Sequence, residues 1–219
     1  MHRDSASKPG PTMSLAPDVL TGFERYLERG IAGGELVEYS IYDNPSVAEG
    51  AATELAIGSH GRIVHVWNHK DEHERFIHSV FERLDPLLDL DFVESTSSGE
   101  SDINIYRASS NSYWDSNALF DVPDGWLGGG SAHSDFDHFD LSWRDVDALD
   151  AFADAEKSSL VHEIGHALGL KDLAEDPRWT RYDSIMSYNH PADRPVNTWF
   201  SEADLQALQH VWGVENDHL

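Results

Sequence analysis

The chain has 219 residues, of which 40% are hydrophobic and 11% aromatic, and this is the composition of a folded globular protein. Forty acidic residues against 15 basic ones give a net charge of −25, so we expect neither nucleic acid nor an anionic membrane as a partner. Cysteine is absent, which excludes disulfides. No apolar run approaches the roughly 18 residues that a membrane-spanning helix requires.

Three regions are expected along the chain. Residues 1–16 are polar and contain two prolines, which predicts a disordered tail without the apolar core of a secretory signal. Residues 17–59 form an N-terminal segment of unknown role, with a helix expected over 18–29 and a strand over 35–42. This segment either packs against the rest or covers a cleft as a pro-segment. Residues 60–219 are expected to form one α+β domain.

The domain begins with alternating strand and helix signals. We expect strands over 62–67, 91–95 and 102–107, and between the first two a helix that Asp71 caps, with Glu74 as its capping-box partner. Its apolar stripe consists of Phe76, Ile77, Val80, Phe81, Leu84 and Leu88. Three histidines lie on or near this helix without a consistent helical spacing, so we interpret them as solvent-exposed: His69, His73 and His78.

A glycine-rich stretch and an acidic cluster follow a polar loop over 109–124. The stretch includes Gly129, Gly130, Ser131 and Ala132, and its bare backbone is suited to hydrogen bonding with an approaching peptide, although a surface loop is the alternative. The acidic cluster can bind calcium or simply be part of an acidic surface: Asp135, Asp137, Asp140, Asp145 and Asp147. His133 and His138 could add ligands for a structural metal.

The pattern over 155–169 predicts a helix that carries the chemistry. His162 and His166 are four residues apart, so on a helix their imidazoles stack one turn apart on one face and can share a zinc ion. Glu163 follows the first histidine, where it can reach a metal-bound water and take its proton. Two histidines and a glutamate on a buried helix would be costly without a partner.

A third ligand is expected just beyond this helix. Gly169 can adopt the left-handed conformation that ends a helix and turns the chain back. Such a turn would bring the carboxylate of Asp172 to the metal, and two histidines with one carboxylate leave a fourth position open for water. Asp176 and Asp183 are less well spaced rivals.

The last part of the chain contains a methionine-centred turn and a closing helix. Met186 is the only methionine after residue 13 and lies in the sequence Ser184-Ile185-Met186-Ser187-Tyr188. A capping pattern over 201–204 predicts a helix that runs through Trp212 and stops at Gly213.

The pattern His-Glu-x-x-His-x-x-Gly-x-x-Asp over 162–172, followed by the turn at Met186, resembles the metzincin zinc peptidases. The resemblance covers about residues 60–213. It implies a twisted, mostly parallel sheet with an antiparallel edge strand, an active-site helix and a C-terminal helix. It also implies zinc as the cofactor, with calcium as a further candidate, and a peptide or protein as the substrate. We expect a monomer, and the resemblance alone suggests an extracellular location.

Individual roles follow from the same resemblance. Residues 129–132 would be the edge strand that pairs with the substrate, and Met186 would form the floor under the metal. Tyr188 matches the tyrosine that serralysins carry beside the zinc, so it would contact zinc at rest or donate to the oxyanion. Matrixins and serralysins have histidine as third ligand, whereas Asp172 resembles the snapalysin branch.

The sequence is also compatible with two other functions. The chain could be a zinc-stabilised binding protein without proteolysis, or a peptidase held inactive by its N-terminal segment. A general base such as Glu163 and an open fourth position favour the enzyme, because a structural zinc site is normally closed by four protein ligands.

Overall fold

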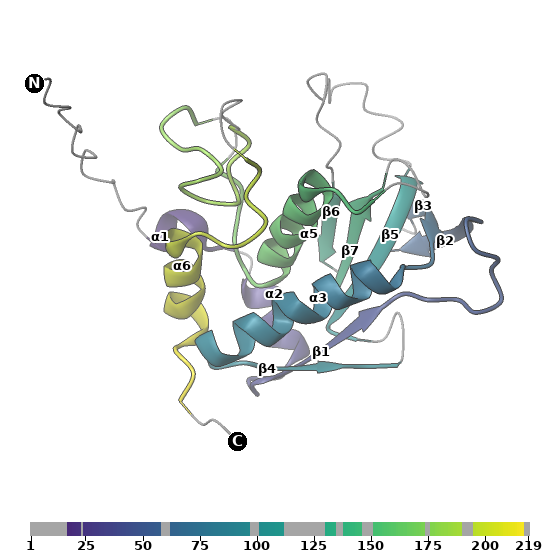
Figure 1. Ribbon diagram of the computed structural model, residues 1–219. Helices are drawn as coiled ribbons and strands as arrows, with labels where there is room; N and C mark the ends of the chain where they lie inside the picture. The colour runs from purple at the N-terminus through teal and green to yellow at the C-terminus, as the bar shows by residue number, and fades with distance from the viewer. Residues whose placement is uncertain are drawn as a thin grey trace, which may run out of the picture.

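A computed structural model (Figure 1) describes residues 17–22, 24–57, 62–96, 101–111, 130–134, 138–145, 151–173, 176–189 and 195–216. The predicted tail over 1–16 and the polar loop beyond residue 111 lie outside these residues. The same holds for Gly129 and for three acids of the cluster, Asp135, Asp137 and Asp147.

The centre of the fold is a seven-stranded sheet. Strand β1 (Leu36–Ile41) is an inner strand that runs parallel to the edge strand β4 (Asp91–Glu94) on one side and to the central strand β5 (Ile103–Asn111) on the other. Strand β7 (Phe139–Arg144) continues the parallel order beside β5, and β6 (Gly130–Ser134) is the antiparallel edge strand. The α+β class and this edge strand are as predicted.

A hairpin extends the sheet beyond β5. Strand β2 (Thr53–Ile57) pairs antiparallel with β3 (Arg62–Trp67), and β3 pairs antiparallel with the second half of β5. The sheet is therefore mixed: β4, β1, β5 and β7 are parallel, whereas β6 and the β2–β3 hairpin add antiparallel pairs. The sequence predicted β3 but missed β2, although Thr53 to Ile57 alternates between partly buried and exposed positions.

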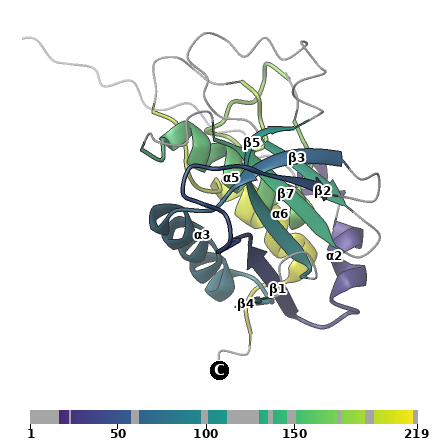
Figure 2. The same cartoon turned by 90° about the vertical axis from the view of Figure 1, so that its right-hand side faces the viewer.

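Two long helices, α3 (Asp71–Leu84) and α5 (Asp154–Ala167), lie on the same side of the sheet, as Figure 2 shows. Residues from α3, α5 and the sheet form a single core cluster. Helix α3 begins at Asp71 with Lys70 as its N-cap, so the predicted capping role of Asp71 is wrong by one position. The helix is followed by a short 3-10 turn, η1 (Asp85–Leu87), where proline ends the α-helical pattern.

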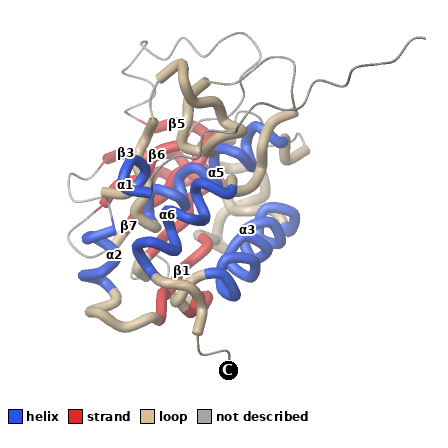
Figure 3. The backbone as a smooth tube through the Cα atoms, turned by 90° about the vertical axis from the view of Figure 1, so that its left-hand side faces the viewer, coloured by secondary structure: helices blue, strands red, loops and turns tan. Residues whose placement is uncertain are grey.

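The N-terminal helix predicted over 18–29 is instead two helices, α1 (Pro17–Leu20) and α2 (Glu24–Gly30). The chain leaves the helical path at Thr21, which forms an antiparallel bridge with Leu170, and Gly22 has a φ of +156° that side-chain-bearing residues rarely adopt. Helix α1 lies beside the C-terminal helix α6 (Glu202–Trp212), as Figures 1 and 3 show. Among the described residues no helix is long and apolar enough to span a bilayer.

The prediction that the histidines near α3 are exposed is wrong for two of them. His69 is 8% exposed and His73 is 1% exposed. His69 Nδ1 donates to the Tyr42 carbonyl over 3.0 Å, and its Nε2 accepts from the Trp143 indole over 3.2 Å. His73 lies one turn before Ile77 on the apolar stripe, which was the available signal for its burial. His78 is half-buried and pairs with Glu94.

Candidate metal centre

Helix α5 carries the predicted histidine pair in its last two turns, and most of its residues from Glu156 onward are buried. This burial explains why the helix is apolar from Leu160 onward apart from His162, Glu163 and His166. Gly165 lies between the two histidines, where a Cβ atom would come within 2.9 Å of the Met186 sulfur. Glycine therefore allows the methionine turn to approach the helix closely, and Met186 is fully buried against it.

The turn after α5 has the geometry that the sequence predicted. Gly169 has a φ of +105°, in the left-handed region that favours glycine. The Leu170 N–H donates to the Gly165 carbonyl over 2.8 Å, which folds the chain back along the helix. Asp172 follows two residues later with its carboxylate directed at the histidines.

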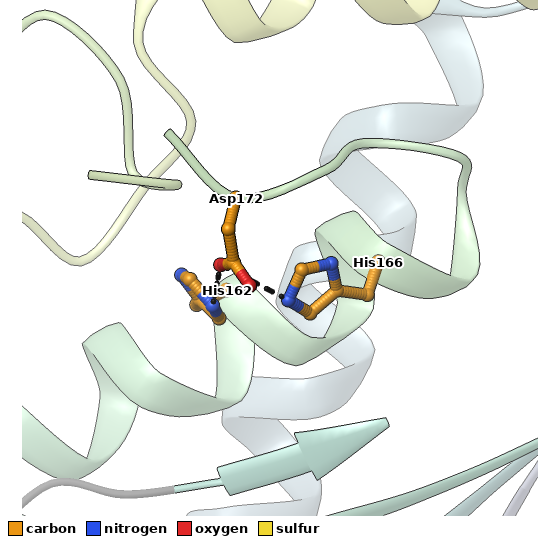
Figure 4. A group of neighbouring side chains, drawn as sticks. All are labelled: His162, His166 and Asp172. Carbon is orange, nitrogen blue, oxygen red and sulfur yellow. Dashed lines mark ion pairs between the residues drawn. The ribbon is translucent and has the colours of Figure 1, made fainter. Parts of the chain in front are cut away.

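Three side chains converge on one point, as Figure 4 shows. Oδ1 of Asp172 lies 3.2 Å from Nε2 of His162 and 3.4 Å from Nε2 of His166. The Nδ1 atoms of the two histidines face backbone carbonyls, Ile185 O at 3.0 Å and Leu170 O at 2.9 Å. Because a carbonyl only accepts, each neutral imidazole has its proton on Nδ1 and a lone pair on Nε2, which is the tautomer that a metal needs.

These distances fit a zinc ion. Tetrahedral ligands about 2.0–2.1 Å from zinc are separated from one another by about 3.3–3.4 Å. The contacts of Asp172 Oδ1 with the two histidines match that edge length. Of the described residues, one group of three or more metal-binding side chains is close enough to share an ion, and it consists of His162, His166 and Asp172.

The two rival carboxylates have other partners. Asp176 pairs with Arg178 over 2.6 Å, and Asp183 accepts from the Thr180 backbone and hydroxyl over 2.8 and 2.9 Å. The structure therefore brings Asp172 to the histidines and leaves the alternatives in the loop that follows.

Burial and neighbouring charges both shift the pKa values of the groups in this site. Burial raises the pKa of Glu163, an effect that the two neighbouring histidines oppose. Burial also disfavours an ionised Asp172, but its hydrogen bonds to the histidines outweigh burial and hold its pKa far below the usual range. Burial opposes the charged form of His166, yet the carboxylates of Asp172 and Glu163 raise its pKa to about 9. A bound metal would replace the proton that this arrangement holds on His166.

Sequence reasoning gave Asp204 only a capping role and missed its link to the metal site. Its buried carboxylate accepts from the Ser201 N–H at the start of α6 over 2.8 Å, as predicted. The same carboxylate accepts from the Ile185 N–H over 2.9 Å and from the Ser184 hydroxyl. Because the Ile185 carbonyl faces His162, Asp204 positions the methionine turn and, through it, the first histidine. An aspartate at this capping position gives no sequence signal of the second role.

Tyr188 lies at the edge of the site. Its ring centroid is 5.8 Å from that of His162, and the residue is 46% exposed. Burial of its phenol and the charge of Asp172 raise its pKa. The tyrosine is therefore a protonated hydroxyl beside the Asp172 carboxylate, in a place from which it can donate to a ligand.

The predicted substrate strand and acidic cluster are only partly described. Gly130, Ser131 and Ala132 belong to β6, which pairs with β7 on one side and packs near α5. Asp140 accepts from Asn104 over 3.1 Å, and Asp145 forms a 2.5 Å ion pair with Arg107. These two acids are engaged within the protein. The side chain of His133 lies outside the described residues, and His138 is 3.9 Å from Asp140.

A mixed sheet, an active-site helix bearing two histidines and a buried methionine turn define a metallopeptidase-type catalytic domain. The chain belongs to the matrixin family, whose model matches residues 62–213. It is also 31% identical over 151 residues to metalloendoproteinase 1 of Glycine max. That alignment covers 66% of this chain and 47% of the relative, so the chain spans about half the length of that protein.

Proposed function

We propose that this protein is a zinc-dependent endopeptidase. The observation that carries the proposal is the convergence of His162, His166 and Asp172, whose donor atoms lie within 4.8 Å of one another beside the buried Glu163. Membership of the matrixin family and the similarity to a metalloendoproteinase support the same reaction class.

Each residue of the site has a separate role in peptide hydrolysis. Zinc, when bound by the three side chains, supplies a Lewis acid that polarises the scissile carbonyl and acidifies the attacking water. Glu163 accepts the proton that this water gives up and then donates it to the leaving amine. Burial raises the pKa of Glu163, which brings its proton affinity closer to that needed for both steps near neutral pH. Tyr188 donates from its protonated phenol to the oxyanion.

Asp172 as third ligand makes the site snapalysin-like within an otherwise matrixin-like chain. A carboxylate is a harder ligand than imidazole and lowers the effective charge of the ion. Together with Glu163 it gives the centre two carboxylates, so the protein neutralises zinc more fully than three histidines would. Calcium remains a second candidate cofactor on the resemblance alone.

The substrate is proposed to bind as an extended peptide along β6. The strand is paired with β7, and none of the other described strands occupies its opposite edge. An open strand edge offers unpaired backbone groups to which a peptide can add as a further strand. Residues 129–132 would supply these groups, which makes main-chain hydrogen bonds the basis of affinity.

The test uses the purified full chain and its Glu163→Gln variant, because glutamine keeps the shape of the side chain and cannot accept a proton. We expect the wild type to cleave casein, to lose cleavage with a chelator and to regain it with zinc. Glu163→Gln should retain one zinc per chain and lose activity by about 10²–10⁴-fold. A wild type that binds zinc without cleaving any unfolded protein would instead indicate a zinc-stabilised binding protein.

A further inference from the structure

The backbone that leads to Asp172 is held firmly on the side of helix α5. The Leu170 N–H donates to the Gly165 carbonyl over 2.8 Å, and the Leu170 carbonyl faces His166 Nδ1 at 2.9 Å. Both polar backbone groups of this one residue are thus committed to the helix. The turn cannot move without disturbing the second histidine.

The opposite side of the same turn is held by the N-terminal segment. The Gly22 N–H donates to the Gly169 carbonyl over 3.1 Å, and the Lys171 N–H donates to the Leu20 carbonyl over 2.7 Å. Together these bonds form a short antiparallel bridge centred on Thr21. The residue immediately before the third ligand is therefore anchored to a segment some 150 positions earlier in the chain.

Residues 20–22, which we call the N-terminal clamp, are themselves fixed. Leu20 is fully buried in the same core cluster as helix α5. Helix α1, which ends at Leu20, packs against α6, and the two helices are side by side in Figure 3. The clamp is therefore part of the core, and through its hydrogen bonds it restrains the turn over residues 169–172.

The clamp can affect Asp172 because it holds the backbone next to this residue. Lys171 on one side is bonded to the clamp, and the Leu173 N–H on the other side donates to the Met186 carbonyl over 3.0 Å. The Asp172 side chain is 37% exposed, so packing restrains it less than it restrains the buried His162. A small shift of its backbone would move the carboxylate away from the two imidazoles, and metal sites tolerate little displacement.

We propose that the N-terminal clamp is a positioning element of the metal centre, so that metal affinity depends on residues outside the part of the chain that matches the matrixin model. The proposal rests on the proposed function in one respect, namely that the bound metal is zinc. On this proposal, the segment before β1 has a specific role, which is to hold the backbone beside Asp172 so that its carboxylate faces the two histidines.

The experiment compares two buried leucines of the full-length protein. Leu20 belongs to the clamp and Leu27 to the next helix, α2, and both are 0% exposed in the same core cluster. Leu20→Ala and Leu27→Ala should destabilise the fold to a similar extent. Zinc affinity, measured by competition with a coloured chelator, should fall by about 10-fold or more in Leu20→Ala only. Leu20→Met should restore it.

Two further measurements keep the proposal falsifiable if a variant is unstable or zinc does not bind. Gly22→Pro removes the N–H that donates to Gly169 and also forces φ to about −65°, away from the +156° of Gly22, so it disrupts the clamp and should weaken zinc binding in the same way as Leu20→Ala. In chelator-treated protein, the Lys171 amide should exchange with solvent faster in Leu20→Ala than in Leu27→Ala.

Equal zinc affinities in the two leucine variants would overturn the proposal. So would equal Lys171 exchange rates. A wild type that binds no zinc would overturn the proposed function, whereas the exchange rates would still show whether the clamp holds the turn.

Discussion

The protein contains two histidine pairs with the same sequence spacing and opposite properties, and of their four side chains only His166 is partly exposed. His69 and His73 are four residues apart, as are His162 and His166, and the ring centroids are 6.2 Å apart in the first pair and 4.7 Å in the second. Burial lowers the pKa of His69 to about 4 and that of His73 to about 3. The carboxylates around His166 raise its pKa to about 9 despite burial.

The difference lies in what faces the second ring nitrogen. In His69 and in His162, Nδ1 faces a backbone carbonyl at 3.0 Å. His69 Nε2 then accepts from the Trp143 indole, whereas His162 Nε2 faces the Asp172 carboxylate. An indole N–H uses up the lone pair of a neutral ring, and a carboxylate attracts a proton or a metal ion to it. Spacing therefore brings histidines close together, but neighbours from other elements decide whether the second ring nitrogen is already hydrogen-bonded or is available to a metal ion.

The largest effect is expected on zinc affinity, from removing the Asp172 carboxylate. Asp172→Ala should lower zinc affinity by more than about 100-fold, because changes to groups that merely orient the ligands already cost about 10–100-fold. Zinc content after dialysis, measured by elemental analysis, checks this. Asp176→Ala and Asp183→Ala are matched controls and should keep one equivalent. Loss of zinc in either control, with Asp172→Ala still loaded, would mean that a different carboxylate binds the metal.

Tyr188 bears on the same comparison, because its ring lies against that of His162 in the second pair. If its phenol donates to the oxyanion, it acts mainly in the transition state. Tyr188→Phe should then lower kcat by about 100-fold with little change in KM or zinc content. Steady-state kinetics on a short peptide substrate provide the measurement. Turnover near that of the wild type would show that the hydroxyl has no part in the reaction.

His69 and His73 should make the free energy of unfolding fall as the pH is lowered. Both native pKa values lie below the value of about 6.5 in an unfolded chain, so the unfolded state takes up protons first as the pH falls. Stability from each residue is therefore present above about pH 6.5 and is lost towards pH 4 and 3. The free energy of unfolding of the wild type should therefore fall between about pH 6.5 and pH 4, and His73→Phe should make that fall smaller by up to about 3 kcal/mol.

Urea unfolding of the zinc-free protein at several pH values measures this effect. His65→Phe, at an exposed position of β3, is the matched control and should keep the pH dependence of the wild type. The idea fails if His73→Phe loses stability with falling pH as steeply as the wild type.

The sequence allowed local features to be predicted and left the long-range ones open. Spacing located helix α5 to within two residues at each end, and Gly169 indicated the turn that brings Asp172 back. These predictions depend on neighbours within one or two turns. The link from Asp204 to the methionine turn, and the burial of His69 against Trp143, join residues that no local pattern connects.

The N-terminal segment shows the same limit most clearly. Its strand over 35–42 was predicted, but nothing in its alternation indicates a place between β4 and β5. Its helix was predicted as one element because the apolar spacing continues through Thr21, yet the bridge to Leu170 interrupts it. Tertiary partners outweighed helix propensity there.

The place of β1 between two parallel strands has a consequence for the nascent chain on the ribosome. The strand over Leu36–Ile41 is synthesised before both of its parallel neighbours, β4 and β5, which begin at Asp91 and Ile103. Until those residues emerge, its backbone groups have no sheet to join, and parallel pairing across such sequence separations is slow. The nascent chain therefore carries an unpaired apolar strand for as long as it takes to translate more than fifty further residues. It is during this interval that the protein would most need a chaperone.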